Sequence, residues 1–232
     1  MSEEWTPKTE LGKKVKAGEI KSIDEIIDSG IQIREAEIVD ALLPDLETDL
    51  VSVGQSKGKF GGGKRRAFRQ TQKKTAEGNK IKFTAIAIVG NKNGYIGLGI
   101  GTSDETVPAK NKAARNAKLN IIRIKRGCGS WECACGEPHS IPFKADGKCG
   151  SVEVKLLPAP KGLRLACSNE LKKILRLAGI KDVWSKARGQ TSTRMNLVFA
   201  CFDALKQLSI TKTREKFDKF AGVCEGAISE KI

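Results

Sequence analysis

Four cysteines and a histidine lie close together near the middle of the 232-residue sequence. Thiolate and imidazole groups are common ligands of tetrahedral zinc, and four of them complete a closed structural site. The zinc deaminase pattern, in which a histidine and a glutamate precede a C-x-x-C pair, is absent, so catalytic zinc is not indicated. The sequence predicts a structural zinc bound by Cys128, Cys133, Cys135 and either His139 or Cys149.

A second interpretation of these cysteines stays open. Their spacing, C-x-x-x-x-C-x-C, is irregular for a zinc site, and the odd total of seven cysteines disfavours a disulfide scaffold. In a reducing compartment cysteine also serves as a small apolar residue, which would make the cluster a set of free thiols in a connector. Cys167, Cys201 and Cys224 are core or surface thiols on either interpretation, and no other cofactor is indicated.

Positive charge is concentrated between residues 57 and 82, where ten basic residues accompany a single acid, Glu77. Five glycines and very few apolar residues in this segment predict a flexible loop that buries no core face. Such a loop suits binding to RNA phosphates. The bases predicted to bind RNA here are Lys57, Lys59, Lys64, Arg65, Arg66, Arg69, Lys73 and Lys74.

Catalytic motifs are poorly matched. The stretch from Gly58 to Lys64 has the spacing of an ATP-binding phosphate loop, but Arg65 stands where such a loop needs a Ser or Thr for magnesium. His139 is the only histidine, and no Ser, His and Asp set occurs at a recognised spacing. The sequence therefore predicts a protein without enzymatic activity.

Charge is unevenly distributed along the chain. Residues 1–50 hold six bases and thirteen acids, whereas the remainder holds thirty-six bases and fourteen acids, an excess of +22. These basic residues repel one another unless a bound polyanion neutralises them, so nucleic acid is the expected partner. The acidic N-terminus is unlike a signal peptide, and the apolar stretches fall short of the roughly 20 residues that cross a bilayer. We therefore expect a protein inside the cell that does not associate with membranes.

The patterns over residues 22–126 predict helical pieces, three strands and a further helix, in the overall order α-β-β-β-α. The elements are expected at residues 22–30, 38–43, 50–53, 81–89, 95–100 and 105–120. Asn93-Gly94 marks a tight hairpin between the last two strands. This order is the topology of a double-stranded-RNA-binding domain.

The helix at 105–120 carries alanines at intervals of four, which permit close packing on a sheet. Its other side presents the predicted RNA contacts Lys112, Arg115 and Lys118. Gly97, Gly99 and Gly101 alternate on the preceding strand, and we expect them to allow close approach by another backbone or by RNA.

A second domain follows, with the order β-α-β-α over residues 151–208, so the fold class is α+β: a double-stranded-RNA-binding-like domain followed by an α/β domain. Its strands are expected near 152–157 and 180–184, and its helices near 168–178 and 193–208. The predicted division of the chain is an N-terminal extension at 1–21, the first domain at 22–126, a Cys-rich connector at 127–150, the second domain at 151–208 and a docking tail at 209–232.

Two long runs of the sequence resemble a known family, universal small-subunit ribosomal protein number five. The first domain of that family is similar to the run KFTAIAIVGNKNGYIGLGIGTSDETVPAKNKAARNAKLNIIRIKRG, preceded by GGGKRRAF. The second is similar to the run LLPAPKGLRLACSNELKKILRLAGIKDVWSKARGQTSTRMNLVFACFDAL. The connector resembles the archaeal and eukaryotic branch in PH-x-x-P-x-K and GKCGSV. Two motifs in the correct order make the resemblance specific.

The resemblance implies a non-enzymatic protein of the cytoplasmic ribosome that binds small-subunit rRNA and supports assembly and decoding accuracy. The implied neighbours are ribosomal proteins four, eight and two. Gly162 falls in the turn after PAP, where the family meets protein four, and Lys186 and Arg188 fall in the family's second-domain segment, so these three are predicted interface residues. The rival hypothesis is a free-standing RNA-binding regulator or RNA-modifying enzyme.

Overall fold

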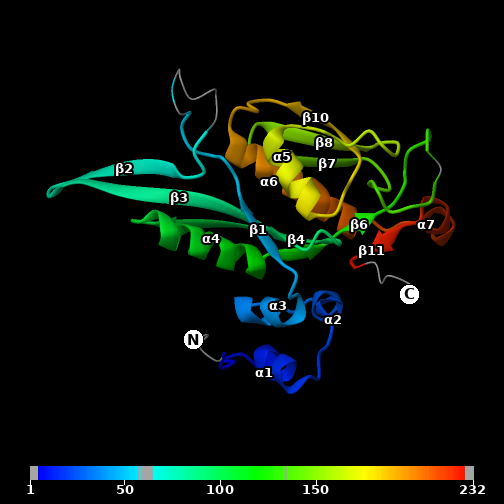
Figure 1. Ribbon diagram of the computed structural model, residues 1–232, viewed down its shortest axis with the longest axis horizontal. Helices are drawn as coiled ribbons and strands as arrows, with labels where there is room; N and C mark the ends of the chain where they lie inside the picture. The colour runs from blue at the N-terminus through cyan, green and yellow to red at the C-terminus, as the bar shows by residue number, and fades with distance from the viewer. Residues whose placement is uncertain (1–4, 57, 59–64, 134, 228–232) are drawn as a thin grey trace.

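The computed structural model describes residues 5–56, 58, 65–133 and 135–227 and contains two large sheets with two helices between them. Figure 1 shows the order of the layers: the sheet of β7, β8 and β10, then α5 and α6, then the sheet of β1, β3 and β4, then α4. The N-terminal helices α1 to α3 lie beyond α4. This arrangement confirms the α+β fold class with two successive domains.

The first sheet has the strand order β1-β3-β4-β5, and β2 pairs with the first half of β3. Every neighbouring pair is antiparallel. The strands are β1 (Glu47–Leu50), β2 (Arg69–Thr75), β3 (Gly78–Gly90), β4 (Tyr95–Ser103) and β5 (Ile121–Arg123). The hairpin predicted at Asn93-Gly94 joins β3 to β4.

Helix α4 (Thr106–Leu119) packs on this sheet through Ala109, Ala113 and Ala117, as the alanine spacing predicts. The glycines of β4 explain how close it comes. A Cβ atom on Gly97, Gly99 or Gly101 would lie 2.1, 2.2 or 2.3 Å from a backbone atom of α4. The expectation that these glycines permit close backbone approach is confirmed, with helix α4 as the neighbour.

The prediction of a flexible loop over residues 57–82 is wrong from residue 69 onward. Residues 69–75 form β2, and they pair with residues 78–84 of β3 from Arg69↔Thr84 to Thr75↔Gly78. The prediction failed because a two-stranded ribbon that is exposed on both faces satisfies its backbone by cross-strand hydrogen bonds and needs no alternating apolar residues. Figure 1 shows this ribbon extending away from the body of the molecule, and we call residues 69–83 the arm.

The N-terminal extension is also more ordered than expected, because residues 10–17 form α1 (Glu10–Ala17). Glu35 anchors it by accepting hydrogen bonds from Trp5 Nε1 at 3.0 Å and from the backbone N–H groups of Lys8 and Thr9 at 2.9 and 2.6 Å. Burial opposes ionisation, yet these donors keep the pKa of Glu35 below its usual range. The predicted helices that follow are α2 (Ile23–Asp28) and α3 (Ala36–Leu42).

The second sheet has the order β7-β8-β10-β9 and carries α5 and α6 on one face. The elements are β7 (Ala145–Cys149), β8 (Val152–Pro158), β9 (Leu165–Ala166), α5 (Asn169–Leu177), β10 (Val183–Arg188) and α6 (Arg194–Ile210). The strand expected at 180–184 begins later, at Val183, because the N–H groups of Lys181 and Asp182 both donate to the His139 carbonyl. β7 lies inside the predicted connector and pairs with β8.

The two sheets share one hydrophobic core, which includes Ile86 and Ile88 of β3, Leu156 of β8, Ile174 of α5 and Val198 of α6. A buried polar link joins the halves as well. Glu170 accepts hydrogen bonds from the Ser52 N–H at 3.0 Å and from Arg194 Nη1 at 2.9 Å. The domain boundaries drawn from the sequence stay a prediction.

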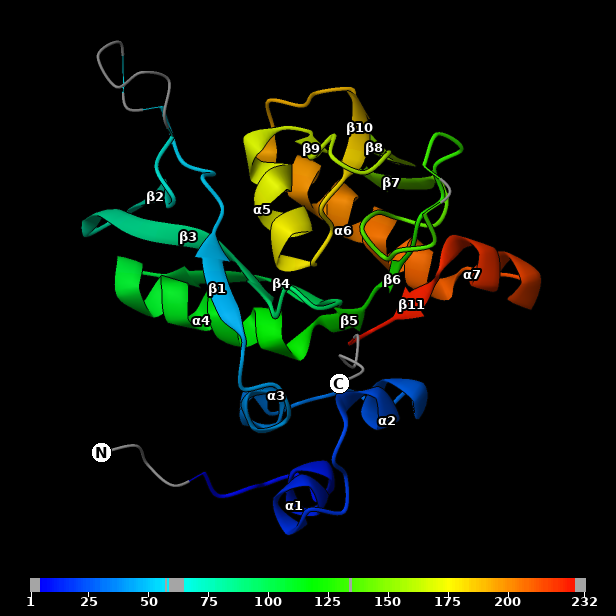
Figure 2. The same ribbon diagram turned by 45° about the vertical axis from the view of Figure 1, so that its right-hand side comes forward.

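The C-terminal segment folds back on the middle of the chain. It contains α7 (Glu215–Ala221) and β11 (Cys224–Glu225), and β11 pairs antiparallel with β6 (Lys125–Arg126). Figure 2 shows β11 and α7, in red, beside β6 and the loop that follows it. The Cys128 N–H also donates to the Ala221 carbonyl at 2.7 Å.

Candidate functional site

The arm presents the densest group of basic side chains in the described part of the chain. Arg69, Lys73 and Lys74 on β2 and Lys80 and Lys82 on β3 are all exposed. Lys73 lies directly opposite Lys80, an arrangement of like charges that destabilises a ribbon standing alone. Glu77, the only acid of the arm, forms an exposed ion pair with Lys80 at 3.2 Å. With five exposed bases and one acid, the arm presents a net charge of +4 to solvent.

The base of the arm lies against the start of α6. Arg65 Nη1 donates to the Ser192 carbonyl at 3.4 Å, and Arg69 Nη1 lies 3.6 Å from Met195 Sδ. Arg66 is exposed, and its carbonyl accepts from the Gly54 N–H. The predicted RNA-binding residues Lys57, Lys59 and Lys64 lie outside the described residues.

The predicted basic face of α4 is partly neutralised within the chain. Lys118 Nζ forms an ion pair with Asp40 at 2.7 Å, and Arg115 lies 3.8 Å from Glu37. Both acids belong to α3. Lys112 is exposed, and none of the ion pairs found in the described residues involves it. Of the three predicted bases on α4, Lys112 and Arg115 are therefore exposed, whereas Lys118 is half-buried in its ion pair.

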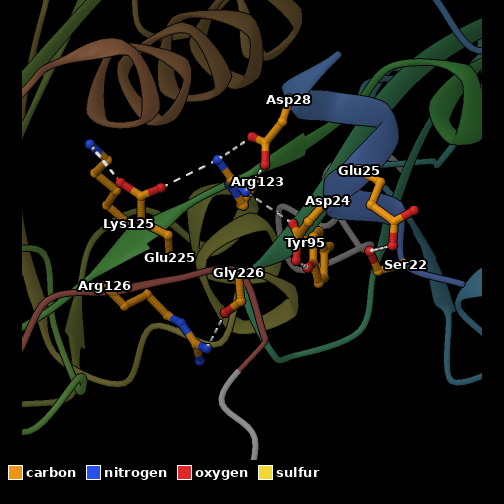
Figure 3. Close-up of polar contacts among 10 residues, drawn as sticks. All are labelled: Ser22, Asp24, Glu25, Asp28, Tyr95, Arg123, Lys125, Arg126, Glu225 and Gly226. Carbon is orange, nitrogen blue, oxygen red and sulfur yellow. Dashed lines mark hydrogen bonds and ion pairs between the residues drawn. The ribbon is translucent and has the colours of Figure 1, made fainter. Parts of the chain in front are cut away.

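The acidic N-terminal region acts as an internal counterion elsewhere too. Figure 3 shows Arg123 of β5 between Asp24 and Asp28 of α2 and Glu225 of β11, at 3.3, 2.8 and 3.3 Å. Tyr95 donates its hydroxyl to Asp24 at 2.7 Å, and burial raises the pKa of that hydroxyl. The segments before α3 and after α7 are therefore joined through one guanidinium.

The structure brings together four of the five predicted metal ligands. The ligand atoms of Cys128, Cys133, Cys135 and His139 all lie within 4.8 Å of one another. Cys149 is not part of this group and packs on the main core from β7. Zinc–sulfur bonds of about 2.3 Å in a tetrahedron place sulfurs about 3.8 Å apart, so a small contraction of the group would fit the ion. We call these four residues the Cys/His cluster.

His139 is oriented for such a role by a buried carboxylate. Its Nδ1 lies 3.0 Å from Asp182 Oδ2, which leaves Nε2 facing Cys133 Sγ at 3.8 Å. A carboxylate on the outer nitrogen of a ligating histidine is the usual second contact of a metal site. The backbone N–H of Lys161 also lowers the pKa of Cys133, which favours a thiolate.

Cys167 and Cys201 are packing residues of the main core. Cys201 is fully buried in α6, and burial raises the pKa of Cys167 to about 11.

The three predicted interface residues, Gly162, Lys186 and Arg188, are all exposed. Gly162 has φ +95°, and an added Cβ would meet no atom within 4 Å.

Sequence reasoning missed a third group of basic residues, on α5 and the loops around it. Arg164, Lys172, Arg176 and Lys181 line one pocket together with Lys92. The signal that was available is the pair Lys172 and Arg176, four residues apart on an amphipathic helix whose other side is apolar.

Comparison with known proteins connects these features to one family. The chain matches "Ribosomal protein S5, N-terminal domain" over residues 67–125 and "Ribosomal protein S5, C-terminal domain" over residues 147–216. The small ribosomal subunit protein uS5 of Nanoarchaeum equitans is 55% identical over 229 residues, which cover 99% of this chain and 98% of that protein.

Two further relatives carry the same name. The uS5 protein of Methanocaldococcus jannaschii is 48% identical and that of Methanothermobacter thermautotrophicus 51% identical. The matches cover 97% of both chains in the first case and 96% of both in the second. None of the helices in the described residues has the length and apolar character needed to cross a bilayer.

Proposed function

The chain belongs to the ribosomal protein S5 family, a structural and non-enzymatic family of the small subunit of the cytoplasmic ribosome, and we propose that it binds small-subunit rRNA mainly through the arm. The observation that carries this proposal is the charge of the arm, which exposes five bases and a single acid. Phosphates of RNA would relieve the repulsion between Lys73 and Lys80.

The proposed surface consists of the arm, the bases that precede it and Lys112 of α4. It includes Lys57, Lys59, Lys64, Arg65 and Arg66 on the basis of sequence. Arg115 and Lys118 belong to the proposed surface as well, with part of their charge offset by the ion pairs to Glu37 and Asp40. Binding of this kind follows the phosphate backbone and carries little sequence information. The family's roles in subunit assembly and decoding accuracy are part of the same proposal.

Removing the arm's charge should flatten the salt dependence of RNA binding. In a variant with Arg69, Lys73, Lys74 and Lys82 all changed to Gln, the slope of log affinity against log salt should become shallower by about three units, since each lost phosphate contact contributes about 0.7 to 0.9. The measurement is filter binding of the full chain to transcribed small-subunit rRNA over a series of KCl concentrations.

A matched control removes four exposed lysines from the acidic N-terminal region, with Lys8, Lys13, Lys14 and Lys21 changed to Gln. Its net charge equals that of the arm variant, and its slope should stay within about half a unit of the unmodified chain. Equal slopes for the two variants would show that the arm makes no special phosphate contacts.

We also propose that the second domain meets neighbouring proteins of the subunit through Gly162, Lys186 and Arg188. Proteins four, eight and two are the proposed neighbours, with Gly162 facing protein four. The turn at Gly162 is exposed, and none of the described residues has an atom within 4 Å of a Cβ added there.

A Gly162→Asp substitution should alter misreading in cells while leaving the protein folded. The positive φ costs about 1 kcal/mol in a non-glycine residue, and an added Cβ meets no described atom within 4 Å. A misreading reporter, together with quantification of the variant in purified subunits, tests this. Gly30→Asp is the control, because Gly30 has φ +69° and equally open surroundings. Normal misreading with full incorporation would rule out the assignment of Gly162.

The Cys/His cluster is the third part of the proposal, as the site of one structural zinc. The donor set is Cys128, Cys133, Cys135 and His139, which is a closed set of three sulfurs and one nitrogen. In the described part of residues 127–144, Cys128, Ile141 and Pro142 are buried and Phe143 is partly buried against the main core. Trp131, Glu132, Cys135 and Glu137 are exposed, so a metal would cross-link a stretch that packing holds weakly. Asp182 would hold His139 in the tautomer that ligates through Nε2.

A further inference from the structure

A groove rich in cations lies between α5 and the turn that joins β3 to β4. Two adjoining pockets of about 560 and 710 Å³ share Lys92, Gly179 and Lys181 in their walls. We call them together the basic groove, and its six basic side chains are Lys92, Arg126, Arg164, Lys172, Arg176 and Lys181. The one carboxylate in the lining, Glu137, is ion-paired with Lys161 at 2.6 Å. The groove therefore carries a strong net positive charge.

The turn between β3 and β4 is docked firmly enough to form a wall. The Lys92 N–H donates to the Leu177 carbonyl at 2.9 Å, and the Gly94 N–H donates to the Ala178 carbonyl at 3.2 Å. These hydrogen bonds occupy carbonyls at the C-terminal end of α5, where negative partial charge would otherwise oppose an anion. The exposed bases Arg164 and Arg176 therefore lie near a helix C-terminus whose last carbonyls already accept hydrogen bonds.

Most cations of the groove form no side-chain ion pair with a carboxylate among the described residues. Lys92 is paired with Glu47, but Arg164, Lys172, Arg176 and Lys181 form no ion pair within the described residues. Arg126 is the telling case. It is only 3% exposed, its Nη2 donates to Asn93 Oδ1 and the Gly226 carbonyl, and its Nε has no hydrogen-bond partner among the residues that the structure describes.

A buried guanidinium without a carboxylate is costly unless an anion reaches it. The Arg126–Gly226 contact is drawn in Figure 3. Because Arg126 lines the pocket that also contains Lys92 and Lys181, an anion in the basic groove would lie among all three charges. Guanidinium and ammonium groups together are the donors that bind phosphate oxygens.

Arg164 is held in an unusual backbone conformation. Its φ is +64°, a region that non-glycine residues rarely adopt. Asp182 Oδ1 accepts the Arg164 N–H at 2.6 Å, and the Arg164 carbonyl accepts from the Val183 N–H at 3.2 Å. The other oxygen of Asp182 contacts His139. One carboxylate therefore fixes both the Cys/His cluster and the backbone of a groove residue, and strain of this kind is typical of functional positions.

We propose that the basic groove is a second phosphate-binding site for small-subunit rRNA, and that Asp182 is the residue that positions Arg164 in it. The inference rests on the proposed rRNA-binding function. An RNA backbone fits better than an acidic protein segment, because the first pocket offers five basic side chains but only Leu165 and Ile180 as apolar anchors. The groove and the tip of the arm lie at opposite ends of β3, about 40 Å apart at about 3.3 Å per residue.

The test removes three charges from the groove in the full chain, with Arg164, Lys172 and Arg176 changed to Gln. The slope of log affinity against log salt for transcribed small-subunit rRNA should become shallower by about two units. The control variant, with Lys8, Lys13 and Lys14 changed to Gln, has the same net charge and should keep the original slope. Circular dichroism spectra should be the same for all three proteins, because these side chains are not part of the core.

The positioning role of Asp182 is tested by non-additivity. Asp182→Ala alone should reduce the slope by about one unit, through misplacement of Arg164. In a chain that already carries Arg164→Gln, the same Asp182→Ala substitution should produce no further change in slope. A general loss of stability would instead lower RNA binding in both backgrounds.

Three outcomes separate the hypotheses. If the arm variant loses slope and the groove variant behaves like its control, the groove inference is overturned while the proposed function stands. If neither variant loses slope, both fail. If the groove variant binds RNA normally but loses affinity for neighbouring small-subunit proteins, the groove is a protein-docking site and the RNA inference is wrong.

Discussion

A single methyl group on Gly99 should unfold much of the first domain. In Gly99→Ala the added Cβ would lie 2.2 Å from the Ala117 nitrogen and 2.5 Å from the Ala113 oxygen, both of them backbone atoms of α4. Backbone atoms cannot turn aside as a side chain can, so the helix must lift from the sheet. We expect the free energy of unfolding to fall by about 4 kcal/mol, at the upper end of single substitutions. Urea denaturation followed by circular dichroism measures this.

Gly30→Ala is the matched control for this substitution. Gly30 has φ +69° and no atom within 4 Å of an added Cβ, so alanine there should cost only about 1 kcal/mol from backbone strain. If Gly99→Ala lowered the free energy of unfolding by no more than Gly30→Ala does, the close packing of β4 against α4 would not matter for stability. The interpretation of the three alternating glycines would then be wrong.

The packing of α4 could be predicted because the sequence marks both partners. Alanines at intervals of four give the helix a face of small side chains, and alternate glycines leave one face of the strand without side chains. Each pattern is therefore informative on its own. The hydrophobic periods of α5 and α6 are equally direct, since each helix must bury one stripe in the shared core.

The arm and β7 could not be predicted in the same way. The arm has no buried face, so its sequence shows no alternation of apolar and polar residues by which a strand could be recognised. β7 reads as ADGKC, in which only Ala145 and Gly147 are buried. Gly147 faces α6, whose backbone lies where a side chain would be. A strand built on such a residue is recognisable only when its helical neighbour is known.

In the candidate sites, too, residues close together in the sequence could be predicted, whereas contacts between distant residues could not. The cysteine spacing predicts a metal cluster but cannot decide between His139 and Cys149, because the choice depends on where β7 carries Cys149. Asp182 lies 43 residues from His139, so no local motif could join them. The basic groove was missed for the same reason, since its six basic residues come from four separate segments.

Loss of the proposed zinc should release the C-terminal segment from the body of the protein. Elemental analysis should find one zinc per chain, and Cys133→Ser should lose it, because structural zinc needs its full ligand set. α7 is weakly held by packing, since Ala221 is its one buried residue and Phe220 is 68% exposed. In Cys133→Ser the Cys128 amide, which donates to Ala221, should therefore exchange with solvent at least about 100-fold faster.

Cys149→Ser provides the control, because Cys149 lies on β7 outside the four-ligand group. This variant should keep its zinc and its slow Cys128 amide exchange, whereas amides of β8 and α5 should exchange at the original rate in both variants. Retention of zinc in Cys133→Ser, or its loss in Cys149→Ser, would contradict the ligand set. Metal-free chain whose Cys128, Cys133 and Cys135 thiols all react with a thiol reagent under native conditions would contradict the zinc itself, and the three cysteines would then be ordinary thiols of the loop that follows β6.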